Sequence, residues 1–116
     1  MLSYRVDQFE FDNPSTEEVV EIDVSRQSVF PHPDVSSFVG AVVSVQAAES
    51  LPEPTPFNVV HGRAEVRQHV KRFADIEIPT DVAWPTYRLD THSPDEVLLV
   101  LCAPGFFIRY QWSTSA

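Results

Sequence analysis

Residues 97–112, VLLVLCAPGFFIRYQW, decide the fold class of this chain. The run from Val97 to Cys102 is continuously apolar, as in a central strand that is covered on both faces. Pro104-Gly105 supplies the two central residues of a type II turn, and residues 106–112 continue in near-alternation. The stretch predicts a β-hairpin with these core side chains: Val97, Leu99, Leu101, Phe106 and Ile108.

The residues before the hairpin predict a strand and a helix. Trp84 to Asp90 alternates loosely and is followed by turn residues, which favours a strand. Arg63 to Ala74 predicts a helix, because its apolar residues stand at i, i+4, i+7 and i+8 and form one stripe. Alternation over 64–78 is also consistent with a long strand. Ile76-Glu77-Ile78 predicts a short strand before Pro79.

The first 25 residues predict a second hairpin. Residues 2–6 and 20–24 both alternate apolar and polar side chains, as half-buried strands do, and Asp12-Asn13-Pro14-Ser15 is typical of a turn. The next apolar residues, Phe9 and Phe11, stand at odd-numbered rather than even-numbered positions. A bulge near Gln8 would account for this change of face.

Residues 35–48 fit two structures. Val35, Phe38, Val39, Val42 and Val43 have helical spacing, with Asp34 as a candidate cap, whereas alternate residues from Val39 to Ala47 have strand spacing. Five valines and a glycine favour a strand over 38–47, because β-branched side chains lose rotamer freedom in helices.

Three alternate prolines in 51–56 (LPEPTP) predict an extended connector, because proline lacks a backbone donor and fixes φ. Neither side of this connector is long enough for a good core, so we expect one domain over residues 1–116. The expected fold is α+β and strand-dominated: a largely antiparallel sheet of five to seven strands with one principal helix packed on a face.

The charge is distributed unevenly. The chain has 17 acidic and 8 basic residues and a net charge of −9. Residues 1–62 carry a net −8, residues 63–72 (RAEVRQHVKR) a net +3, and residues 73–116 a net −4. An acidic molecule repels polyanions, so we expect no direct binding to nucleic acid or to an anionic membrane, and a partner with a basic surface.

No catalytic or metal-binding constellation is recognised in the sequence. His32 and Asp34, and Asp90 and His92, stand two residues apart, but a metal site needs three or four converging ligands, so no metal or cofactor is expected. Cys102 ends an apolar run and is interpreted as a core residue rather than a nucleophile. We expect that the chain is not an enzyme.

A single cysteine excludes a disulfide framework within the chain. The N-terminal residues lack the pattern of a signal peptide, and no apolar run is long enough to span a bilayer. The expected location is the cytoplasm.

The segment FNVVHGRAEVRQHVKRF, residues 57–73, resembles the helix-opening segment of SnoaL-like proteins of the NTF2 fold. The resemblance covers these 17 residues. That family opens with helices where this chain is expected to open with strands, so the resemblance implies neither a pocket nor a catalytic residue here.

The expected function is that of a small acidic protein-binding module: an inhibitor, immunity protein, antitoxin or adaptor that masks a basic site on a partner. A partner that handles nucleic acid is one case of this class. One alternative is a small enzyme or ligand-binding domain with an aromatic-lined pocket that uses His69, Asp90 or His92. Another is a structural subunit of a phage or other assembly, and a homo-oligomer is compatible with each. Two candidate binding surfaces follow from the charge pattern: an acidic strand face (Glu17, Glu18, Glu21, Asp23) and a basic helix face (Arg63, Arg67, Lys71).

Overall fold

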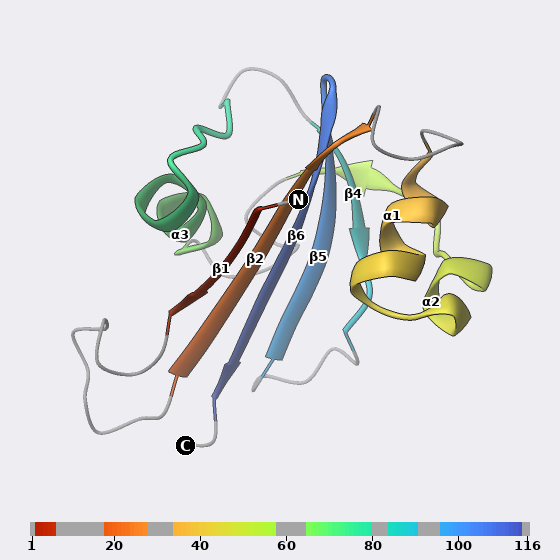
Figure 1. Cartoon of the computed structure of the whole chain (residues 1–116), viewed down its shortest axis with the longest axis horizontal. Coiled ribbons are helices and arrows are strands. Elements are labelled where there is room, and N and C mark those ends of the chain that lie inside the picture. The colour runs from red at the N-terminus through yellow and green to blue at the C-terminus, as the bar shows by residue number, and fades with distance from the viewer. Residues whose placement is uncertain are drawn as a thin grey trace.

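The C-terminal hairpin lies in the middle of an antiparallel sheet (Figure 1). The computed structural model describes residues 2–6, 18–27, 34–57, 65–79, 84–90 and 96–114. Strand β5 (Glu96–Ala103) pairs with β6 (Phe106–Thr114), and Gly105 between them has a φ of 85°, as the third residue of a type II turn requires. The predicted hairpin is confirmed.

The other strands extend the sheet on both sides of this hairpin. The described strands form one six-stranded sheet in the order β1-β2-β6-β5-β4-β3, with every neighbouring pair antiparallel. Their bounds are β1 (Leu2–Val6), β2 (Glu18–Arg26), β3 (Thr55–Pro56) and β4 (Pro85–Arg88). The N-terminal hairpin is therefore confirmed, and β2 pairs with the last strand of the chain. Phe9, Phe11 and the bulge near Gln8 lie outside the described residues.

Helix α3 (Glu65–Ala74) covers one face of the sheet. Val66 and Val70 are fully buried, and Phe73 and Ala74 are partly buried against the same core, so the predicted apolar stripe is confirmed. On the sheet side the core contains four of the five predicted hairpin residues (Val97, Leu99, Leu101, Ile108), together with Val20, Ile22, Tyr110 and Trp112. Phe106 is only partly buried and lies edge-on to Trp84.

The short strand expected over Ile76-Glu77-Ile78 is not formed. Asp75 has a left-handed φ of 56°, which ends the helix at a residue type that tolerates this region better than most. The chain then turns back, Ile78 is buried in the core, and the Arg67 guanidinium donates to the carbonyl oxygens of Ile78 and Pro79. These carbonyl groups are therefore bonded to a side chain rather than to a neighbouring strand.

The strand expected over 38–47 is wrong, because the structure has two helices there. Helix α1 (Val35–Val42) is capped by the Asp34 carboxylate, which accepts from Ser37 N at 2.9 Å, and α2 (Val45–Glu49) is capped by Ser44, which accepts from Ala47 N at 3.0 Å. Phe38 and Val39 are fully buried in a second core with Val100 and Phe107. Two caps and a buried apolar stripe outweigh the few tenths of a kcal/mol that each valine costs in a helix (~0.5).

The helices lie on opposite sides of the sheet, with α3 on one side and α1 and α2 on the other (Figure 1). The expected class, α+β, strand-dominated and largely antiparallel, is confirmed, with a strand number inside the expected range. The described residues form three helices rather than one principal helix, because α1 and α2 supply the cover for the second face.

Candidate functional site

One part of the sheet face that carries α1 and α2 is polar. Alternate residues of β1, β2 and β6 face this side, and the strand register sets Ser3 beside Asp23, Arg5 beside Glu21, and Asp23 beside Arg109. We call these five side chains, together with Gln111, the polar network. Because side chains alternate across a strand, the same register turns the neighbouring apolar residues toward α3.

Arg109 holds the polar network together. Its Nε donates to Asp23 Oδ2 at 2.5 Å, one terminal nitrogen donates to Gln111 Oε1 at 2.5 Å, and the other lies 3.5 Å from Glu21 Oε2. Arg5 donates to the second oxygen of Glu21, and Ser3 Oγ donates to Asp23 Oδ1 at 2.5 Å. Two arginines thus balance two carboxylates.

Two members of the predicted acidic strand face are paired with arginine within the chain. Glu21 and Asp23 are neutralised within the chain, and the Asp23 side chain is only 11% exposed. Strand β2 includes Glu18, but the side chain of Glu18 and the whole of Glu17 lie outside the described residues.

The sequence pattern does not single out Arg109 as the partner of the strand carboxylates. The alternation of side chains along residues 106–112 does place Arg109 and Gln111 on the face opposite Ile108 and Tyr110. This alternation predicts the face on which Arg109 lies, but it does not predict which residue pairs with it, because Asp23 is 86 residues away in the sequence. Two shallow depressions of about 200 and 180 Å³ border this network, one beside Val19 and Ser113 and the other beside Ser3 and Tyr4.

The predicted basic helix face is also partly used within the chain. Arg67 donates to two backbone carbonyls and stacks on Phe57 at 5.3 Å, and Lys71 pairs with Asp75 at 3.3 Å. The Lys71–Asp75 pair is exposed and contributes little to stability. Arg63 lies outside the described residues.

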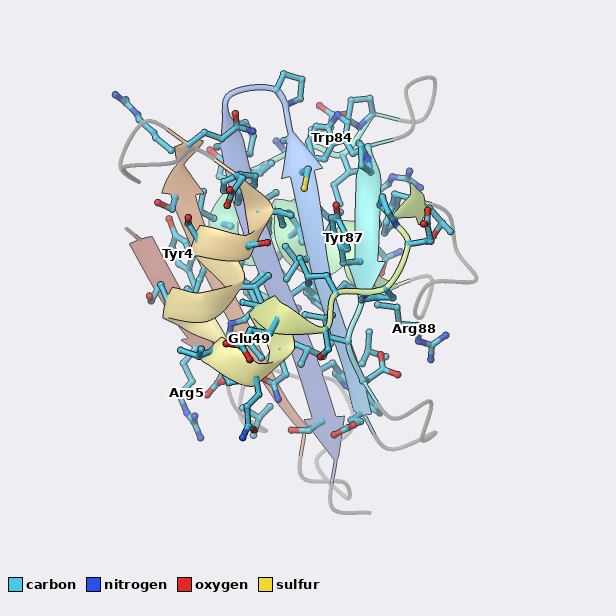
Figure 2. The ribbon with its side chains drawn as sticks, turned by 90° about the vertical axis from the view of Figure 1, so that its right-hand side faces the viewer. Tyr4, Arg5, Glu49, Trp84, Tyr87 and Arg88 are labelled. Atoms are coloured by element: carbon cyan, nitrogen blue, oxygen red, sulfur yellow. The ribbon has the colours of Figure 1, made fainter. Side chains whose placement is uncertain are left out.

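The layer formed by residues 34–54 carries acidic residues without basic ones. It contains Asp34, Glu49 and Glu53, and the sequence has no lysine or arginine between Arg26 and Arg63. Glu49 and Glu53 are exposed, and Glu49 lies on α2 in front of the sheet (Figure 2). We call residues 34–54 the acidic layer. Helix α3 on the opposite face has three basic residues and one glutamate, so the described helices on the two faces differ in charge.

His69 and Asp90, the candidate acid–base groups, have separate partners. His69 Nδ1 lies 2.6 Å from Tyr110 Oη and its ring stacks on that of Tyr110 with the centroids 6.0 Å apart, which ties α3 to β6. The buried Asp90 carboxylate accepts from Arg88 Nε at 3.0 Å and from Leu98 N at 3.0 Å, which links the end of β4 to β5. His32 and His92 lie outside the described residues.

Cys102 is half-buried against the α1–α2 core. Burial raises the pKa of its thiol from 9.0 to about 11, because the thiolate loses solvation. The pKa of Tyr87 on the neighbouring strand is also raised. Burial is the largest cause, and the charges of Cys102 and Glu53 add to it.

We expect Cys102 to react with iodoacetamide about a hundredfold more slowly in the native protein than in the unfolded chain at pH 8, because only the thiolate is nucleophilic. The measurement is alkylation followed by mass spectrometry, with the urea-unfolded protein as the reference. Equal rates in the two states would show that the thiol is open to solvent.

Within the described ranges, no group of three or more His, Cys, Asp or Glu residues could hold a metal ion. No helix in the same ranges is both long and apolar enough to cross a membrane. No family model, curated protein or solved structure matches the chain.

Proposed function

We propose that the chain is a small acidic protein-binding module whose partner presents a basic surface. The acidic layer is the observation that carries this proposal. In the polar network arginines neutralise the carboxylates, whereas the sequence places no lysine or arginine in residues 34–54. The negative field on this side therefore remains available to steer a positively charged protein.

The acidic layer also offers an apolar contact. Val45, at the start of α2, is 65% exposed and is followed along the same short helix by Gln46 and Glu49. Protein interfaces commonly combine an apolar centre with a polar rim. Val45 would provide the apolar centre of the interface, and Glu49 and Glu53 would provide its polar rim. These two glutamates then take the binding role that the sequence pattern predicts for Glu21 and Asp23.

The partner class that fits this chemistry is a protein with a cationic site, including one that handles nucleic acid. Carboxylates on the acidic layer would occupy the places of phosphates in such a site. An inhibitor, immunity protein, antitoxin or adaptor acts in this way, and none of these requires a catalytic group in this chain.

The test uses Glu49→Lys with Glu77→Lys as the matched control. Both glutamates are exposed, and Glu77 follows α3 on the opposite side of the sheet. Proteins captured from native lysate by the wild type are identified by mass spectrometry, and their association rates are then measured. We expect Glu49→Lys to slow association several-fold at low salt and Glu77→Lys to leave it nearly unchanged, because charges at the rim act mainly on the on-rate.

The effect of Glu49→Lys should shrink as salt increases, since the Debye length falls to about 3 Å near 1 M. A partner whose association is slowed equally by the two variants would show that net charge, not the acidic layer, drives the encounter. Tight binding to duplex DNA or RNA at physiological salt would contradict the proposed class of partner.

A further inference from the structure

The two edges of the sheet differ in their capacity to accept another strand. Strand β3 has two residues, one of them Pro56, and Pro52 and Pro54 precede it. Proline lacks the backbone donor that a further strand would need, so this edge is blocked. Strand β1 has five residues (LSYRV) and no proline.

In the described part of the chain, β1 pairs with β2 on one side and stands at the end of the strand order. Alternate residues of an antiparallel strand direct their N–H and C=O groups away from the neighbour. Ser3 and Arg5 are exposed at this edge, and Figure 2 places Tyr4 and Arg5 on the outermost strand. The edge is thus a template for one more antiparallel strand.

We propose that this edge pairs with β1 of a second copy of the chain, so that two sheets join across a twofold axis. Antiparallel pairing centred on Tyr4 sets Tyr4 opposite Tyr4, Ser3 opposite Arg5, and Leu2 opposite Val6 of the second copy. The surface is self-complementary, as a twofold interface requires. The Tyr4 pair is an aromatic cross-strand contact of the kind that stabilises sheets.

A second copy keeps the charge balance of the polar network, because each network would exchange its own Arg5 for the Arg5 of the other copy while Arg109 stays beside Asp23 and Glu21. In this register Arg5 of one copy lies beside Ser3 of the other, and Ser3 already donates to Asp23 in its own chain. Asp23 lies one strand further, about 10 Å from Arg5 across two strand spacings, which an extended arginine side chain covers. The depression of about 180 Å³ lined by Ser3, Tyr4 and Asp23 lies at this point.

Arg5 can make this contact at little cost. Its side chain is 67% exposed, and its pair with Glu21 is a surface ion pair of small net value. The twofold axis produces this contact twice, because each copy has one Arg5 and one Ser3–Asp23 pair. An unrelated strand would supply the backbone bonds without this reciprocal match.

The test is sedimentation equilibrium of the full chain over a concentration series at physiological salt, which screens the repulsion between two copies that each carry a net charge of −9. We expect the wild type to approach twice the chain mass of 13.1 kDa. Arg5→Glu should raise the dissociation constant of the dimer at least about tenfold, since it sets a carboxylate against the Ser3–Asp23 pair. Arg26→Glu is the matched control, because Arg26 is exposed at the far end of β2.

A second pair of variants tests the register directly. Opposed residues of an antiparallel pair have Cα atoms about 4.5–5.5 Å apart, which allows a disulfide. Tyr4→Cys in a Cys102→Ala background should give a disulfide-linked dimer on mild oxidation, whereas Ala41→Cys on the exposed side of α1 should not. A wild type that stays monomeric at every concentration, or a dimer weakened equally by Arg5→Glu and Arg26→Glu, would overturn the proposal.

Discussion

Replacing Leu99 by alanine is expected to lower the free energy of unfolding by about 2–5 kcal/mol. Leu99 is fully buried in β5, opposite Tyr110 of β6, in the core that α3 covers. The substitution removes apolar contacts and leaves a cavity between the sheet and the helix, where the fixed strand register limits relaxation. The loss should appear in urea unfolding as a lower midpoint with an unchanged m-value.

Val45→Ala is the control for this measurement. Val45 is an aliphatic residue that is 65% exposed, so its truncation should change stability by no more than about 0.5 kcal/mol. Amide exchange gives an independent check, because residues 97–102 should exchange only through global unfolding. A Leu99→Ala variant as stable as Val45→Ala would mean that β5 is not in the core.

The hairpins and α3 could be predicted because their signals are local. A continuous apolar run followed by Pro104-Gly105 specifies a central strand and a turn within ten residues. The stripe through Val66 and Val70 specifies the buried side of α3 in the same way. In each case the side chains that define the element are the ones that it buries.

The segment 38–47 could not be assigned because its two periodicities compete. Its valines favour a strand, while Asp34 and Ser44 cap two helices. The choice depends on what covers the face formed by Val100 and Phe107, where the Phe38 ring lies 5.3 Å from that of Phe107. That face is created by strands more than 50 residues later in the chain, so tertiary packing overrides the local preference.

Charge pairing is the other feature that local sequence does not reveal. Glu21 and Asp23 alternate with apolar residues, a pattern typical of a solvated acidic face. Their partner Arg109 is reached only because β6 inserts beside β2 in the sheet. Asp90 shows the same effect: an acidic residue at the end of a predicted strand has a side chain with no exposed surface and pairs with Arg88.

The second large effect is expected from Asp23→Asn, which should lower the free energy of unfolding by about 2–4 kcal/mol. Asp23 and Arg109 have side chains only 11% and 12% exposed, so their charges are largely removed from water. The asparagine keeps the size of the side chain but removes the charge. Arg109 then retains Glu21, at 3.5 Å, as its nearest anion.

Arg5→Ala provides the contrast within the polar network. It breaks the ion pair with Glu21, but the Arg5 side chain is 67% exposed, so the expected loss is below about 1 kcal/mol. The comparison is made with monomeric protein at low concentration, which separates folding from self-association. Equal losses for Arg5→Ala and Asp23→Asn would show that burial does not set the strength of these pairs.

Salt dependence distinguishes the buried pair from a surface pair. Near 1 M salt the Debye length is about 3 Å, which screens exposed charges but acts much less on buried ones. The destabilisation by Asp23→Asn should therefore persist at high salt, while that by Arg5→Ala should vanish. In a double-mutant cycle with Arg109→Gln, the coupling to Asp23 should be at least about 1 kcal/mol, because the second substitution removes the charge that the first deprives of its nearer anion. Additive losses would mean that Asp23 and Arg109 stabilise the sheet independently.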